Sequence, residues 1–140
     1  MRLSIRNQFA GTVAGVASGE AMSTVKVRLD GGQEVTAAIT AESARDLTLD
    51  EGTAVLVLVK STEVAVAAAA VPRISIRNQL AGTVTAVEHG VVMTTVKLTI
   101  DGGATVTAAI TRDAAEDLDL AEGAAAVALI KSTEVGVALP

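Results

Sequence analysis

Ser4 and Arg6 are the first residues of the chain whose types and spacing suit them to binding a ligand. Residues two apart in an extended strand face the same way, so a strand here places a hydroxyl beside a guanidinium. The guanidinium has five donors and no acceptor. The same two residues return 71 positions later as Ser75 and Arg77. A hydroxyl beside a fixed cation suits an anion that is rich in acceptor oxygens.

The whole chain repeats at this 71-residue offset. Residues 2–69 align with residues 73–140 without a gap, and roughly 40 of those 68 positions are identical. We therefore expect two tandem copies of one small domain. The expected boundaries are residues 1–69 for the first domain, 70–72 for a linker and 73–140 for the second domain.

Composition limits what each small domain can be. Half of the 140 residues are apolar, only Phe9 is aromatic, and there is no cysteine, so no disulfide or thiolate metal site exists. Units of this size are marginally stable alone, so we expect burial between copies and between chains. No signal peptide is recognisable, and no apolar run reaches the roughly 18 residues that a membrane span needs. We expect a cytoplasmic protein with no membrane partner.

Alternating apolar residues predict a mainly β fold. In residues 22–29, for example, Val25, Val27 and Leu29 share one face. Thr40 is a good N-cap for one short helix, and Thr111 is its counterpart in the second copy. Two tandem OB-like small β-barrel domains, each with one short helix, are therefore expected. The first repeat is expected to have strands over residues 2–5, 9–17, 22–29, 34–39, 54–59 and 63–66.

Three polar clusters recur in both copies, and all of them offer donors: Ser-x-Arg-Asn near the start, Thr at the helix cap, and Lys-Ser-Thr before the last strand. A helix N-terminus adds unpaired backbone N–H groups. A fully deprotonated tetrahedral dianion accepts hydrogen bonds and donates none, whereas monohydrogen phosphate carries a proton that needs an acceptor. Such a site would therefore disfavour phosphate. The structural alternative is that Thr40 only caps a helix, Arg6 only pairs with a surface acid and Ser61 only ends a strand.

These motifs resemble a known family. Ser-Ile-Arg-Asn-Gln with Gly-Thr-Val, then Val-Thr-Ala-Ala-Ile-Thr, then Lys-Ser-Thr-Glu-Val, is similar to the Mop domain of the molbindins, over nearly the whole chain and twice. The resemblance implies a small cytoplasmic protein that binds molybdate or tungstate for intracellular storage or homeostasis. It also implies OB-like domains that associate as a homotrimer and hold the oxyanions at interfaces between domains. No other cofactor and no direct metal ligand are implied.

The resemblance also implies which residues contact the oxyanion. Several come from one face of a domain and the others from the helix start of a neighbouring domain. The match fails where Ser43 corresponds to Ala114, which has no hydroxyl. The expected residues are Ser4, Arg6, Asn7, Lys60 and Ser61 with Thr40 and Ser43, and in the second copy Ser75, Arg77, Asn78, Lys131 and Ser132 with Thr111.

Three other functions are alternatives. Catalysis is disfavoured because the one histidine, His89, lies in a predicted turn and matches Ser18, and because Lys60 and Ser61 are expected strand neighbours that face opposite ways. A nucleic-acid partner is disfavoured by the net charge of −5 and the single phenylalanine. The alternative that stays open is an oxyanion-sensing module that works with a transporter or regulator partner.

Overall fold

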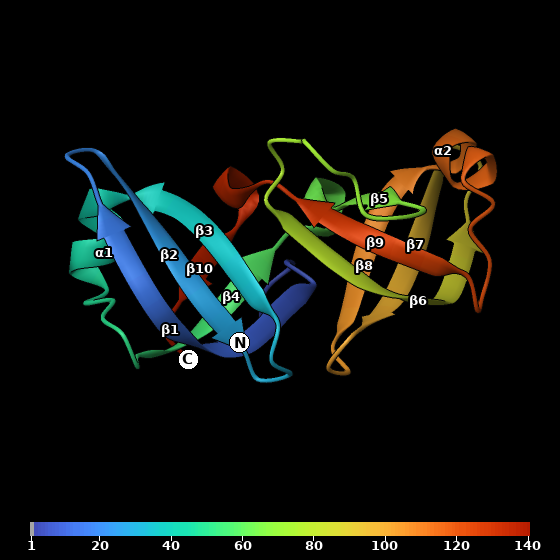
Figure 1. The fold of residues 1–140 in the computed structure, drawn as a ribbon. Helices are drawn as coiled ribbons and strands as arrows, with labels where there is room; N and C mark the ends of the chain where they lie inside the picture. The colour runs from blue at the N-terminus through green and yellow to red at the C-terminus, as the bar shows by residue number, and fades with distance from the viewer. Residues whose placement is uncertain (1) are drawn as a thin grey trace.

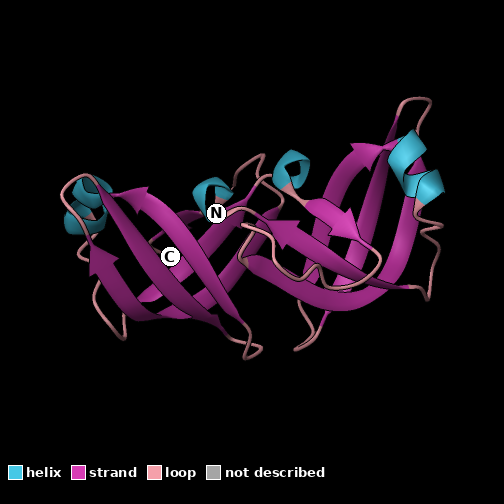
Figure 2. Ribbon diagram, turned by 45° about the horizontal axis from the view of Figure 1, so that its top comes forward, coloured by secondary structure: helices cyan, strands magenta, loops and turns pink. Residues whose placement is uncertain are grey.

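The computed structural model describes residues 2–140, which form two curled five-stranded sheets side by side (Figure 1). Each repeat carries one short helix, α1 (Ala41–Asp46) or α2 (Arg112–Asp117). Figure 2 shows that the remaining structure is almost entirely strand and loop. The mainly β fold expected from the sequence is thus confirmed. Met1, the first residue of the expected first domain, lies outside the described residues.

The elements follow the same order in both repeats. Each repeat has three long strands, a helix, a fourth strand, a single 3-10 turn and a short last strand. In the first repeat these are β1 (Asn7–Ser18), β2 (Met22–Leu29), β3 (Glu34–Thr40), α1, β4 (Ala54–Val59), η1 (Ser61–Glu63) and β5 (Ala65–Ala67). In the second repeat they are β6 (Asn78–His89), β7 (Met93–Ile100), β8 (Thr105–Thr111), α2, β9 (Ala125–Ile130), η2 (Ser132–Glu134) and β10 (Gly136–Ala138).

Alternation along the strands decides which side chains reach the core. The predicted face of β2 is buried, with Val25 and Val27 at 0% exposure and Leu29 at 4%. β1 is antiparallel to both β2 and β4, and its register shifts between Val13 and Gly15. Such a bulge bends a strand and strengthens its twist. The equivalent shift in β6 curls the second sheet in the same way.

The last strand of each repeat belongs to the sheet of the other repeat. The strand orders are β10-β4-β1-β2-β3 and β5-β9-β6-β7-β8. Val137 of β10 pairs with Val57, and Val66 of β5 pairs with Ala128. β5 also lies against β8, and β10 against β3, so each exchanged strand helps to close the curl of the sheet that it joins. The repeat boundaries in the sequence stay a prediction, because each sheet contains residues from both repeats.

The junction between the repeats is filled by a shared core and by two touching turns. One hydrophobic cluster includes Phe9, Val57 and Val64 from the first repeat with Ile100 and Ile130 from the second. At the hairpin turns, the backbones of Gly31 and Gly102 approach so closely that a Cβ on Gly31 would lie 2.8 Å from the Gly102 carbonyl oxygen. The two repeats are therefore one packed body.

Two expectations about the first repeat were wrong in detail. Residues 2–5 are not a strand, because the ladder between β1 and β4 ends at the pair Asn7–Val59 and leaves earlier residues without a partner. The expected strand over residues 63–66 is shorter, since η1 extends to Glu63 and β5 begins only at Ala65. Within residues 2–140, no helix has the length and apolar character to cross a membrane.

The turn contact at the junction can be tested by adding one methyl group. Gly31→Ala is expected to lower the free energy of unfolding by about 1–3 kcal/mol, because the new Cβ overpacks against the Gly102 backbone. Gly15→Ala is the matched control, since no described atom lies within 4 Å of its Cβ position. Urea denaturation of both variants measures the difference. Equal stabilities would show that the turns do not touch in solution.

Candidate functional site

The cations of the first predicted cluster lie where β1 begins and β4 ends. Because Asn7 pairs with Val59, the adjoining residues Arg6 and Lys60 both lie just beyond the last ladder pair and are exposed. In the second repeat, Asn78 pairs with Ile130, so Arg77 and Lys131 adjoin in the same way. Ser4 and Ser75 are exposed in the segments just before these cations. Arg6 and Lys60 make no ion pair within residues 2–140, which leaves their charges available to a ligand.

The serine after each lysine is the least satisfied polar residue of the cluster. The hydroxyl oxygens of Ser61 and Ser132 are buried, and within residues 2–140 neither has a hydrogen-bond partner. η1 lies against β8 of the other repeat, and η2 lies against β3, so both hydroxyls are close to the junction. A buried unsatisfied hydroxyl costs about 1–3 kcal/mol. An oxygen-rich ligand would relieve that cost by accepting the hydrogen bond.

Asn7 and Asn78 make hydrogen bonds across the junction between the repeats. The Asn7 side chain donates to the Thr107 carbonyl oxygen at 2.8 Å and accepts from the Thr107 N–H at 2.8 Å. Asn78 makes the same two bonds to Thr36, again across the junction. Both asparagines are at most 3% exposed. Their carboxamides therefore join the repeats, and sequence alone could not separate this use of a polar side chain from ligand binding.

The predicted helix starts have the expected local geometry. The Thr40 hydroxyl oxygen accepts from the Ser43 N–H at 3.1 Å and donates to the Ser43 hydroxyl at 2.7 Å. The Thr111 hydroxyl oxygen accepts from the Ala114 N–H at 3.1 Å, and no second hydroxyl is present there. Figure 1 places α1 and α2 at opposite outer ends of the molecule. The helix starts that Thr40 and Thr111 cap therefore lie at the two outer ends of the molecule.

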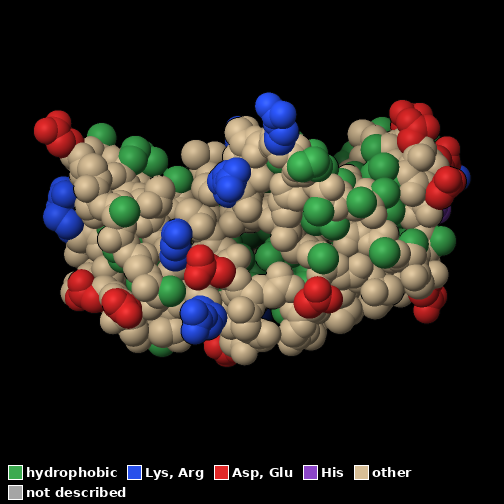
Figure 3. Space-filling view, in the orientation of Figure 1, with side chains coloured by type: hydrophobic (Ala, Val, Ile, Leu, Met, Phe, Trp, Pro, Cys, Tyr) green, Lys and Arg blue, Asp and Glu red, His purple; other side chains and the backbone are tan. Residues whose placement is uncertain are grey.

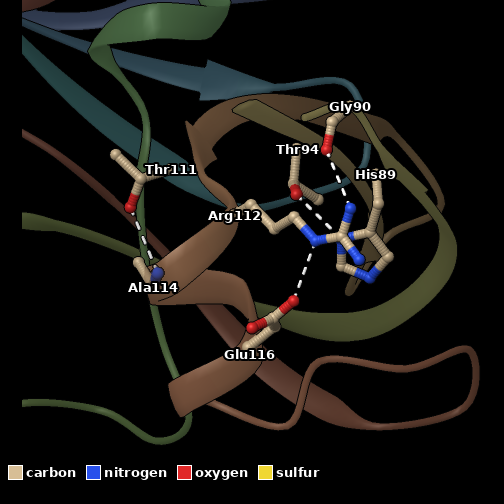
Figure 4. A network of polar contacts seen from close by, with 7 residues as sticks. All are labelled: His89, Gly90, Thr94, Thr111, Arg112, Ala114 and Glu116. Atoms are coloured by element: carbon tan, nitrogen blue, oxygen red, sulfur yellow. Dashed lines mark hydrogen bonds and ion pairs between the residues drawn. The ribbon is translucent and has the colours of Figure 1, made fainter. Parts of the chain in front are cut away.

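Arg112 is a charged residue near the second helix start that the sequence reasoning missed. Its guanidinium forms an ion pair with Glu116 at 2.8 Å and donates to the Gly90 carbonyl oxygen at 3.1 Å. Figure 4 shows the side chain directed toward the hairpin turn and away from Thr111. His89 beside it is exposed and shares a hydrogen bond of 2.9 Å with Thr94. Ala41 occupies the Arg112 position in the first repeat, so comparing the copies could have found it.

Positive charge is present near the middle of the molecule. Figure 3 shows several Lys and Arg side chains near the middle of one face, together with Asp and Glu side chains, and mainly Asp and Glu side chains at the end of the second repeat. Within residues 2–140, no group of three or more His, Cys, Asp and Glu side chains is placed to hold a metal ion. The described cluster thus offers donors and positive charge, which is the chemistry of an anion site.

Comparisons with known proteins match this arrangement. The TOBE domain model matches residues 3–66 and again 74–137. Molybdenum-pterin-binding protein MopB of Rhodobacter capsulatus is 46% identical over 141 residues, which cover 100% of this chain and 52% of that protein. Molybdenum transport protein ModE of Herbaspirillum seropedicae is 41% identical over 140 residues, covering 99% of this chain and 52% of that protein. The chain thus spans about half the length of these relatives.

A solved structure shares the fold over its whole length. The cytoplasmic molybdate-binding protein ModG, with molybdate bound, is 38% identical, each chain is covered completely, and the TM-score is 0.97. The two crystal structures of ModG suggest a cooperative binding mechanism for that protein. These matches confirm the expected resemblance to tandem Mop domains.

The role of the junction asparagines can be measured by substitution. Asn7→Ala is expected to lower the free energy of unfolding by about 2–4 kcal/mol, because both backbone groups of Thr107 lose their partner in a buried setting. Gln8→Ala is the control, since within residues 2–140 the Gln8 side chain bonds only to Ile5 of its own segment. Urea denaturation gives both values. If Asn7→Ala unfolds like Gln8→Ala, the carboxamide does not hold the junction together.

Proposed function

The chain belongs to the TOBE-domain family, and we propose that it binds molybdate and tungstate as a cytoplasmic protein of molybdenum storage or homeostasis. The names of MopB and ModE and the molybdate bound by ModG support this ligand class. All three match nearly the whole of this chain. A binding role is proposed rather than a catalytic one, since the cluster offers hydrogen-bond donors and charge and no paired acid and base.

The observation that carries the proposal is the pair of buried, unsatisfied hydroxyls of Ser61 and Ser132. Each follows a lysine and lies beside the position of an arginine, Arg6 or Arg77. A ligand that accepts a hydrogen bond from the serine and carries negative charge matches both features at once. Ser4 and Ser75 add hydroxyls in the neighbouring segments.

Selectivity follows from the absence of a carboxylate among the proposed contacts. Molybdate and tungstate are fully deprotonated dianions at neutral pH and accept hydrogen bonds at every oxygen. Monohydrogen phosphate must place its proton against an acceptor; Arg and Lys side chains have none, and a Ser or Thr hydroxyl that accepted this proton would have to turn its own proton away from the anion. We therefore expect phosphate to bind much more weakly.

We infer that a second copy completes the site. The helices α1 and α2, whose starts Thr40 and Thr111 cap, lie at the outer ends of the molecule (Figure 1). A neighbouring copy would bring its helix start to Arg6 and Lys60. The resemblance to molbindins favours a homotrimer, and native mass spectrometry of protein equilibrated with molybdate tests that number. A monomer that still bound molybdate would rule out the shared site.

An oxyanion-sensing module is the second candidate function. ModE of Yersinia pestis is named a transcriptional regulator, and this chain is 34% identical to it over 145 residues, covering 53% of that protein. In a sensing module of this kind, anion binding at the same site would change how the chain interacts with a partner protein. Co-purification of a transporter or DNA-binding partner in the presence of molybdate would favour this role over storage.

Removal of the cations tests the proposed contacts. Arg6→Ala and Lys60→Ala are each expected to weaken molybdate binding roughly tenfold to hundredfold at the affected sites, because each loses a charge-assisted hydrogen bond. Lys26→Ala is the matched control, since Lys26 also recurs between the copies but lies exposed on β2. Isothermal titration calorimetry measures the affinities. Wild-type binding by both cluster variants would exclude these contacts.

The difference between Ser43 and Ala114 predicts two classes of site. Ala114→Ser restores the missing hydroxyl and is expected to tighten the weaker class, because the new side chain can donate to the anion as Ser43 is proposed to do. Ser43→Ala should make the first helix start resemble the second and should weaken binding less than Arg6→Ala. A calorimetric titration that fits one class of site in the wild type would contradict the assignment.

A further inference from the structure

Two of the proposed anion contacts, Ser75 and Arg77, lie in a loop that no sheet ladder holds. Residues 68–77, between β5 and β6, form neither helix nor strand, and both side chains are exposed (Figure 1). The ladder between β6 and β9 begins only at the pair Asn78–Ile130. Within residues 2–140, Arg77 makes no ion pair. Contacts other than the ladder must therefore fix where these two side chains lie.

The carboxamide of Gln79, the last residue of the repeated Ser-Ile-Arg-Asn-Gln motif, closes this loop. Its Oε1 accepts from the Val71 N–H at 2.9 Å, and its Nε2 donates to the Val71 carbonyl oxygen at 2.8 Å and to the Ile76 carbonyl oxygen at 3.4 Å. Both donors of the amide group and one of its acceptor sites are thus used within the loop. Gln79 itself is fixed in β6, where it pairs with Leu129. A residue of a paired strand therefore holds both ends of the segment 71–76.

The bond to Ile76 fixes the residue that stands between the two proposed contacts. Ile76 is half-buried and lines a depression of about 280 Å³ together with Leu129 and Lys131. Lys131 is the other cation of this cluster. Holding the Ile76 carbonyl group therefore keeps Ser75 and Arg77 near Lys131.

The first repeat has the same bond. The Gln8 Nε2 donates to the Ile5 carbonyl oxygen at 3.0 Å, and Ile5 is the residue between Ser4 and Arg6. Gln8 is likewise a strand residue, paired with Leu58. The asparagine of the motif holds the junction between the repeats, and the glutamine holds the segment that carries the serine and the arginine.

We propose that Gln79 is a positioning residue that holds Ser75 and Arg77 in the conformation that binds the oxyanion, and that Gln8 does the same in the first repeat. The glutamine acts through the segment and does not touch the anion. A segment that is ordered before the anion arrives loses less conformational entropy on binding, so its contacts contribute more to affinity. This role rests on the proposed anion site.

Replacement of the glutamine by methionine tests the role, because methionine keeps the length of the side chain and cannot donate an N–H. Gln79→Met is expected to weaken molybdate binding roughly tenfold at the sites that use Ser75 and Arg77, since the anion must then order the segment. Isothermal titration calorimetry measures the affinity. Hydrogen exchange at the Val71 N–H should become faster, because that group loses its acceptor.

Gln33→Met is the matched control. Gln33 also donates to the carbonyl oxygen of a residue distant in sequence, Asp101, at 2.7 Å, but it lies in the turn between β2 and β3. Its molybdate affinity should equal that of the wild type. Gln8→Met is the second test variant, should Gln79→Met fail to fold, and is expected to weaken the sites that use Ser4 and Arg6. Circular dichroism checks the fold of each variant.

A double-mutant cycle separates positioning from a purely structural role. If Gln79 acts through Arg77, the effect of Gln79→Met should fall below roughly threefold in an Arg77→Ala background, because changes to one unit are not additive. A tenfold effect that persisted in that background would overturn the positioning role, and so would wild-type affinity in both methionine variants. The proposed function would survive either result. A wild-type chain that did not bind molybdate would overturn both.

Discussion

The structure depends on the exchange of the last strand between the repeats. Without β10, the backbone groups of β4 on that side would be an unpaired sheet edge, and β9 would lose β5 in the same way. Two buried asparagines reinforce the exchange, since Asn7 and Asn78 each bond both backbone groups of a threonine in the other repeat. The shared core then leaves no surface along which the halves could separate without exposing valine and isoleucine side chains.

This exchange also determines where the anion chemistry lies. In each repeat the chain must turn between the fourth strand and the last strand, which joins the sheet of the other repeat. The 3-10 turns η1 and η2 make this connection. Ser61 and Ser132 begin them, which buries their hydroxyls beside the other repeat. Arg6 and Lys60 stay exposed because the ladder ends before them. A buried donor next to exposed cations is an arrangement in which a small dianion can be desolvated on one side and neutralised on the other.

Duplication has left two copies that are alike in their cores and different on their surfaces. The cap residues recur, yet among the described residues the second repeat alone has an apolar hairpin tip and an arginine that ties its helix to that tip. Exposed valines are unfavourable in water.

The sequence by itself determined the repeat, the strands, the helix caps and the residue types of the anion cluster. Each of these follows from local rules, such as alternation in β2 or the N-cap preference of Thr40. Tertiary structure alone decided that β5 and β10 each join the sheet of the other repeat. A strand of three residues is too short for its pattern to indicate which strand it pairs with. It also decided that Asn7 binds the Thr107 backbone across the junction, and that residues 2–5 have no ladder to join. A polar side chain can satisfy its hydrogen bonds within the chain or with a ligand, and only the position of the neighbouring backbone fixes which.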